Sequence, residues 1–335
     1  MTTVAERIAS DLPELARRYR LGDIRGVEYL KSRVNDNYRL ETATGAYALR
    51  LSSHKRAVEA VAYEHRVMAY LQERGFPTPP LVCTAEGEPQ TVVNGSLYRL
   101  TRFVHGEPYD PDRPAHLAAI ARTLARYHLL MQDYPEPGPK EGFAPVLTAM
   151  RRGLADLPWP SADGPSGPWD ACPDLRERLP GLRAALQRTI ARLEAVPYAA
   201  LPWLAIYGSC RSGSYIFQGD TVAAMLDYDV GYEDALLLDL GIAVLDFAAI
   251  PPEKVALDPE ITRRFVAAYR EVAALEHPEL IPTFVRARIL KRELLRYGRF
   301  QSRPSEGRVE KLLRGIARLA WLDANEERMV DAVTA

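Results

Sequence analysis

The sequence is poor in cysteine. It contains three (Cys83, Cys172 and Cys210), which are far apart, odd in number and without a C-x-x-C pair. This spacing provides neither a disulfide framework nor the ligands of a zinc site. We therefore expect a protein of the reducing cytoplasm.

Long apolar runs and an excess of one charge are also missing. The longest apolar run, 235–250, is interrupted by Asp239 and Asp246 and is too short to span a bilayer. Residues 1–21 mix acids and bases with apolar residues, which is not the pattern of a signal peptide. The 43 basic and 44 acidic residues nearly cancel, whereas a nucleic-acid footprint needs a clustered basic face. We therefore expect neither a membrane nor a nucleic acid as a partner.

The pattern that is present predicts a mixed α+β protein. In the first third of the chain, short apolar runs alternate with polar turns, which indicates a five-stranded antiparallel sheet with two amphipathic helices, 3–20 and 57–73. From residue 114 the helical period dominates, and 258–335 reads as three helices with solvated Arg- and Glu-rich faces. Between these regions, 134–180 is rich in proline and glycine, as in a long structured insertion.

One stretch, 205–229, organises the rest. It reads as a loop, a strand, a tight turn at Gln218-Gly219-Asp220 and a second strand that ends on two acids. The layout resembles the catalytic segment of the aminoglycoside phosphotransferase and type II homoserine kinase family, in which H-G-D-x-x-x-x-N precedes a hairpin and D-x-D. The matching positions are Gly208, Gly213, Phe217 and Asp227.

This resemblance implies a bilobal, protein-kinase-like fold. Residues 1–104 would form an N-terminal lobe built on the antiparallel sheet. Residues 105–335 would form a mainly helical C-terminal lobe, with the insertion at about 134–180 as a cap over the substrate.

The resemblance also implies a nucleotide site in the N-terminal lobe. Asn35 and Asn37 flank a hairpin turn whose backbone would face phosphates. Arg50 stands at the position of the phosphate-contacting cation, and in relatives that cation pairs with a glutamate that corresponds to Glu64. Backbone groups near His105 would receive the adenine, if ATP binds.

In the C-terminal lobe the resemblance is incomplete. Tyr207 stands where the family has histidine, Ser209 where it has the catalytic aspartate, and Ser214 where it has the metal-binding asparagine. Asp227, with help from Asp229, remains as a metal ligand. A serine near neutral pH is not a general base without a partner, so the sequence predicts weak kinase chemistry and no required cofactor. His128 and Asp239 match family positions that support the loop from below.

A ligand cleft is then expected beside the loop and the cap. Its candidate residues are Tyr207, Arg211, Asp229, Tyr232, Trp159, Trp169 and Trp203. The three tryptophans have an equally good alternative role, which is to bury the cap against the lobe.

Three functions stay open at this point. The expected one is a non-catalytic protein that binds a small natural product, as antibiotic self-resistance members such as the azinomycin resistance protein do. The alternatives are an ATP- and magnesium-dependent phosphotransferase with a rewired site and a pseudokinase that regulates a partner. A homodimer through the C-terminal helices is also expected.

Overall fold

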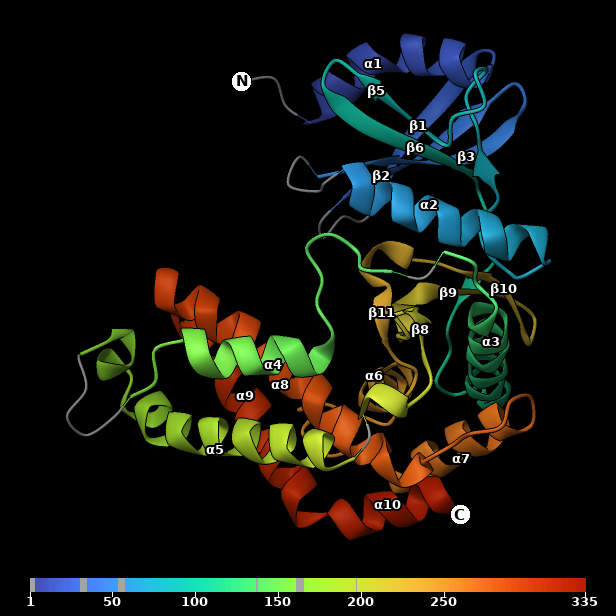
Figure 1. Ribbon diagram of the computed structural model, residues 1–335. Coiled ribbons are helices and arrows are strands. Elements are labelled where there is room, and N and C mark those ends of the chain that lie inside the picture. Colours follow the sequence, from blue (N-terminus) through green and yellow to red (C-terminus); the bar gives the residue numbers. More distant parts are fainter. Residues whose placement is uncertain (1–3, 31–34, 54–57, 137, 161–165, 197) are drawn as a thin grey trace. The chain divides into compact units, whose positions relative to one another are not determined.

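The computed structural model describes residues 4–335 except 31–34, 54–57, 137, 161–165 and 197. The chain divides into two compact units (Figure 1). Unit 1 comprises Met1–Pro108 and Tyr215–Asp229, and unit 2 comprises Tyr109–Ser214 and Val230–Ala335. The first boundary lies four residues beyond the predicted one. The segment Tyr215–Asp229, which the prediction placed in the C-terminal lobe, belongs to unit 1.

Unit 1 is built on a six-stranded antiparallel sheet of order β1-β2-β3-β6-β4, with β5 also paired to β6. The prediction of five strands missed β4, because two residues are too few for a periodic signal. A second sheet has the order β10-β9-β7. The elements are α1 (Val4–Tyr19), β1 (Ile24–Leu30), β2 (Asp36–Thr42), β3 (Gly45–Leu51), α2 (Val58–Glu73), β4 (Leu81–Val82), β5 (Gln90–Val93), β6 (Ser96–Arg102), β7 (Glu107–Pro108), β9 (Tyr215–Gln218) and β10 (Thr221–Met225).

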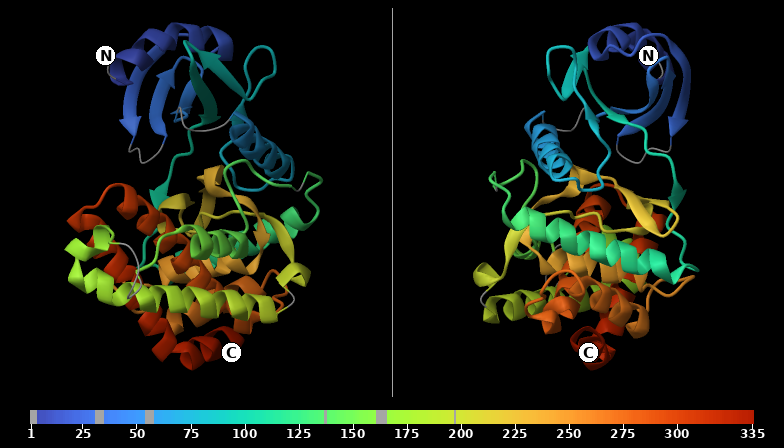
Figure 2. Two further views of the ribbon diagram at one scale, coloured as in Figure 1. Left: turned by 60° about the vertical axis from the view of Figure 1, so that its left-hand side comes forward. Right: turned by 90° about the vertical axis from the view of Figure 1, so that its right-hand side faces the viewer.

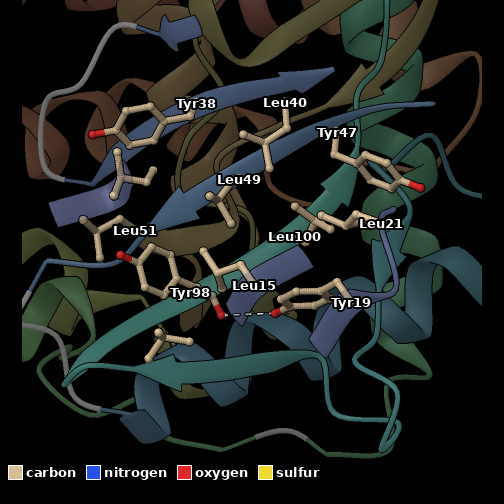
Figure 3. Close-up of a cluster of buried hydrophobic side chains, with 12 residues drawn as sticks. Leu15, Tyr19, Leu21, Tyr38, Leu40, Tyr47, Leu49, Leu51, Tyr98 and Leu100 are labelled. Carbon is tan, nitrogen blue, oxygen red and sulfur yellow. Dashed lines mark hydrogen bonds between the residues drawn. The ribbon is translucent and has the colours of Figure 1, made fainter. Parts of the chain in front are cut away.

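The core of unit 1 lies between α1 and the main sheet (Figure 3). Leu40 and Leu49 are fully buried, because alternate residues of β2 and β3 point to the same face of the sheet. Leu15 comes from α1, and the Tyr19 hydroxyl donates to the Tyr98 carbonyl at 3.4 Å. This packing makes β2 and β3 a rigid support for the side chains on their other face.

Unit 2 is mainly helical. Its elements are α3 (Pro114–Gln132), α4 (Val146–Asp156), α5 (Pro173–Ala195), β8 (Trp203–Ile206), β11 (Tyr232–Ala235), α6 (Leu237–Phe247), α7 (Pro259–Arg270), α8 (Ile281–Ser302), α9 (Glu306–Ala324) and α10 (Glu326–Thr334). Single 3₁₀ turns lie at Pro168–Ala171, Tyr198–Ala200, Ser212–Ser214, Tyr228–Val230 and Pro278–Leu280. The region predicted as three C-terminal helices contains four, because the last one breaks at Asn325.

Helix α8 packs against α4, α6 and α9 (Figures 1 and 2). Gly241 of α6 permits a close approach, since a Cβ there would lie 2.8 Å from the Phe284 carbonyl carbon. The prediction that the charged faces of these helices are solvated is wrong for α8, where Arg286 and Glu293 are buried. Arg286 pairs with Asp323 of α9. Across the described residues, we find no helix with the length and apolarity that a membrane span requires.

Candidate functional site

Unit 1 contains a cavity of about 320 Å³. Ala48 and Arg50 of β3, Met68 of α2, Val104 and Asp227 are among its lining residues. A mostly apolar cavity of this size with a few charged groups is typical of a small-molecule site. All of its walls come from unit 1, so this unit forms the cavity by itself.

Arg50 is the central cation of this cavity. Its Nε donates to Asn37 Oδ1 at 2.9 Å and its Nη2 to Asp227 Oδ1 at 3.1 Å. Asp229 Oδ2 lies 4.0 Å from Nη1, which is buried and makes no hydrogen bond within the described part of the chain. A buried guanidinium N–H without an acceptor is costly, so this atom is available to an anionic ligand.

The predicted ion pair between Arg50 and Glu64 is wrong. Arg50 pairs with the two aspartates instead, and the buried Glu64 carboxylate lies 3.7 Å from Arg99. Arg50 and Arg99 are directly opposite each other on β3 and β6. The sheet therefore presents Arg50 and Arg99 on the same face, and Arg99, which lies nearer α2, pairs with Glu64.

Asn35 and Asn37 position these charged groups through their side chains. Asn35 Nδ2 donates to Asp229 Oδ2 at 3.2 Å, and its Oδ1 accepts from the Ser53 N–H at 3.1 Å. Asn37 holds Arg50, as described above. Contact of these asparagines with phosphates stays a prediction.

Asp227 has an unusual backbone conformation. Its φ is +59°, in the left-handed region that costs a non-glycine residue conformational energy, although aspartate tolerates it better than most. Such strain concentrates at functional sites. Asp227 and Asp229 form a pair of carboxylates, and no group of three or more metal-ligating side chains occurs among the residues that the structure describes.

The segment after β6 leaves backbone groups open at the cavity. The Phe103 N–H donates to the Ala46 carbonyl at 3.0 Å, while the N–H groups of Val104 and His105 make no hydrogen bond to a described residue. The His105 carbonyl accepts from Gln218 Nε2 at 3.0 Å. Two donors next to an apolar wall suit the edge of a planar base, as predicted for this segment.

In unit 2, Asp239 fixes the backbone of the loop that begins at Tyr207. Its carboxylate accepts the N–H groups of Tyr207 at 2.6 Å and Gly208 at 2.7 Å, and His128 Nε2 lies 3.2 Å from Oδ2. The predicted supporting roles of Asp239 and His128 are confirmed by these bonds. Gly208 has φ +71°, and a Cβ there would lie 2.4 Å from the Val230 carbonyl oxygen, so the turn requires glycine.

The side chains of the loop bond to one another. Arg211 Nη2 donates to Ser209 Oγ at 2.8 Å, and Ser209 Oγ lies 3.2 Å from Ser214 Oγ. Both serines are buried. Tyr207 is fully buried and packs against Tyr127, and its contact with a ligand stays a prediction. Of the four side chains at Tyr207, Ser209, Arg211 and Ser214, that of Arg211 is partly exposed.

The three tryptophans have packing partners within unit 2. Trp159 lies 5.1 Å and the buried Trp169 lies 6.4 Å from the ring of Tyr297 on α8, measured between ring centroids. Trp203 Nε1 donates to the Tyr198 carbonyl at 2.9 Å. These contacts match the alternative role of the tryptophans, and contact with a ligand stays a prediction.

Tyr232 belongs to a polar cluster that the sequence did not reveal. Lys291 Nζ of α8 donates to the Tyr232 hydroxyl at 2.6 Å and to the Ala144 carbonyl at 2.9 Å. Burial lowers the pKa of Lys291 to about 8, against the opposing effect of Asp234. Asp234 itself accepts the Val146 N–H that begins α4, at 2.7 Å. The only hint in the sequence was a lysine on a helix otherwise rich in arginine.

Comparison with known proteins gives a consistent result. Residues 27–275 match the phosphotransferase enzyme family. A homoserine kinase of Rhodopseudomonas palustris is 27% identical over 83% of this chain and 80% of its own length, and one of Nitrobacter winogradskyi is 24% identical over 92% and 90%. An amicoumacin kinase structure superposes with a TM-score of 0.70 at 15% identity, over 95% of this chain and 96% of that one.

These findings overturn the expectation of a non-catalytic binding protein. That expectation depended on the replacement of three loop residues, and it gave too little weight to the rest of the chain. The relatives that match most of this chain are named as kinases, and the family match spans both units. The fold is the expected α+β, aminoglycoside phosphotransferase-like fold. The chain belongs to the phosphotransferase enzyme family.

Proposed function

We propose that this protein is an ATP-dependent phosphotransferase that acts on a hydroxyl group of a small molecule. The observation that carries the proposal is the buried Nη1 of Arg50 in the cavity of unit 1, which makes no hydrogen bond to a described residue and lies next to Asp227 and Asp229. A cation beside two carboxylates matches the needs of nucleotide phosphates and their metal ion.

The residues of unit 1 fit ATP and magnesium. Val104 and His105 offer a base N–H groups that no described residue accepts, and Arg50 offers a phosphate an N–H without a hydrogen bond in the same part of the chain. Asp227 and Asp229 would hold magnesium, which usually takes one or two carboxylates and completes its shell with phosphate and water oxygens. When bound, the metal supplies positive charge that stabilises the transferred phosphoryl group.

The loop of unit 2 would orient the acceptor. Phosphoryl transfer depends mostly on positioning and charge, and the need for a strong base is small. The hydroxyl of Ser209 is a hydrogen-bonding group that can align an acceptor hydroxyl, and Arg211 fixes its direction. Because serine does not take up the proton, we expect slower turnover than an aspartate would give.

The relatives suggest where to look for the acceptor. Several that match most of this chain are named homoserine kinases, so a hydroxylated amino acid is the first class to test. L-homoserine is the first compound, followed by L-serine, an amino alcohol and an aminoglycoside.

The test is phosphate transfer from ATP, followed by mass spectrometry of the acceptor with and without magnesium. We expect a magnesium-dependent phosphorylated product, and at least a ~100-fold slower rate for Asp227→Asn. Asparagine tolerates the left-handed backbone, so this variant removes charge with little strain. Asp220→Asn, in the exposed turn of the same hairpin, is the control and should keep its rate. A panel without any phosphorylated product, or an unaffected Asp227→Asn variant, would contradict the proposal.

A further inference from the structure

Unit 2 carries a group of cations near the loop that make no ion pair with a described residue. Arg288 and Lys291 are three residues apart on α8, so they share one side of the helix. Arg211 belongs to the loop and lies close enough to Arg288 for mutual repulsion. We call Arg211, Arg288 and Lys291 the cation cluster.

Arg288 is the member with the least compensation. It is only partly exposed, and it makes no hydrogen bond or ion pair with any residue in the described ranges of the chain. Burial lowers the pKa of its guanidinium, and Arg292 and Arg211 lower it further, against the opposing effects of Tyr232 and Asp239. A guanidinium nevertheless stays charged in a protein, so this charge has no direct ion-pair partner among the described residues.

Arg211 and Lys291 are held by neutral groups. Arg211 Nη2 donates to the Ser209 hydroxyl, and its Nε is buried with no acceptor among the described residues. Lys291 is held by the Tyr232 hydroxyl and the Ala144 carbonyl, and its Nζ lies 4.1 Å from the centroid of the Tyr232 ring. Neither cation makes a direct ion pair with a residue that the structure describes.

The acids whose charges act on Arg288 and Lys291 are Asp239 and Asp234, and both accept hydrogen bonds from neutral groups. Asp239 accepts two backbone N–H groups below the loop. Asp234 accepts the N–H groups of Val146 and Ala235 and the hydroxyl of Tyr198. Both are fully buried. Each keeps its negative charge and acts on the cluster from a distance, but neither forms an ion pair with Arg211, Arg288 or Lys291.

We propose that the cation cluster binds an anionic group of the acceptor, a carboxylate or a phosphate ester, next to the loop that positions its hydroxyl. This inference rests on the proposed function and narrows it to acceptors that are hydroxylated acids. Guanidinium groups bind such oxyanions in bidentate geometry. A polycationic aminoglycoside would be repelled by the same side chains.

The first test measures anion binding without catalysis. We would record the thermal midpoint of the whole protein in inorganic phosphate, and in glycolate, against chloride at equal ionic strength. A ligand that binds only the folded state raises the midpoint, and we expect a rise of at least about 2 °C. Arg288→Gln should lose the rise. Arg299→Gln, an exposed position on the same helix, should keep it.

A phosphate could also bind at Arg50, so the variant Arg50→Gln separates the two sites. A rise that persists in Arg50→Gln and disappears in Arg288→Gln supports the cluster. A rise that depends on Arg50 alone, or no rise in the unmodified protein, would overturn it. In chloride, Arg288→Gln should be as stable as the unmodified protein or more so, because it removes an unpaired buried charge. A structural arginine would instead cost stability.

The second test uses the kinetics of L-homoserine and its uncharged amide. Arg288→Gln should raise KM for the acid about tenfold, leave KM for the amide within twofold, and leave KM for ATP unchanged. An increase confined to ATP would assign Arg288 to the transferred phosphate and overturn the acceptor site. Turnover without discrimination between acid and amide would defeat this inference and leave the proposed function intact. Anion binding at the cluster without any turnover would support this inference and contradict the proposed function.

Discussion

The cavity of unit 1 and the loop region of unit 2 differ in the balance of their charges. In unit 1, the guanidinium of Arg50 faces two aspartates. In unit 2, Arg211, Arg288 and Lys291 face acids that are already committed to backbone and tyrosine donors. The two carboxylates of the first region suit a metal cation bound to a phosphate, whereas the three cations of the second suit an anion. This difference in charge suits a reaction between a metal-bound nucleotide and an anionic acceptor.

The largest expected effect tests whether Asp239 holds the backbone of the loop that begins at Tyr207, whatever side chains the loop carries. Asp239→Ala removes the acceptor of two buried N–H groups and of His128, which should lower the free energy of unfolding by about 3 kcal/mol. Urea unfolding measures this change. Asp258→Ala is a matched control, because Asp258 caps α7 by accepting the N–H of Glu260 at 2.8 Å and should cost only about 1 kcal/mol.

Equal losses for the two variants would contradict the assignment of Asp239. The folded fraction of Asp239→Ala could also keep the full rate of phosphate transfer despite a large loss of stability. That result would show that other contacts hold the loop in its geometry.

The second effect concerns the missing carboxylate of the loop. Ser209→Asp places an acid where Arg211 Nη2 now donates at 2.8 Å, so the new charge has a partner. We expect the rate of phosphate transfer to rise about tenfold, at the low end of what a positioned base contributes. Steady-state kinetics with the best acceptor measures it.

Ser212→Asp adds the same charge at an exposed position of the loop and is the control. A folded Ser209→Asp protein with no gain in rate would show that Ser209 does not lie at the reacting hydroxyl.

The smallest effect is the pH dependence of acceptor binding. Because burial lowers the pKa of Lys291 to about 8, its ammonium is present at pH 7 and mostly lost at pH 9.5. The groups that face it are Tyr232 and Asp234 of β11 and Arg288 of its own helix. Affinity for an anionic acceptor should therefore fall about threefold over this range, because one of the three cations of the cluster loses its charge.

Lys291→Arg stays charged throughout and should give a flat profile of KM against pH. A profile that is unchanged by this substitution would assign the titration to another group.

Much of unit 1 was predictable from the sequence. The strands β2, β3 and β6 have clear alternation, and the turn at Asn94-Gly95 fixes the hairpin of β5 and β6. The ion-pair partner of Arg50 was not predictable, because Arg50 and Arg99 lie opposite each other and the one nearer α2 pairs with Glu64. The sequence pattern of a strand does not show which of its side chains lies near a helix.

The site in unit 2 was predicted less well for the same reason. The support of the loop by Asp239 followed from the family resemblance. The burial of Arg286 and the neighbourhood of Arg288 did not, since charged residues on a long helix are normally solvated. The start of α5 at Pro173 was also missed, because the proline-rich composition concealed the helix.

The way Asp239 and Gly208 hold the loop has a consequence for how this protein can change. The shape of the backbone is set by a carboxylate from α6 and by a glycine, and neither depends on the side chains at Ser209, Arg211 or Ser214. We therefore expect the chain to fold with other side chains of similar size at each of these three positions. The side chains of the loop can then change while its backbone stays the same, so we expect a few substitutions to be enough to alter which acceptor the protein uses.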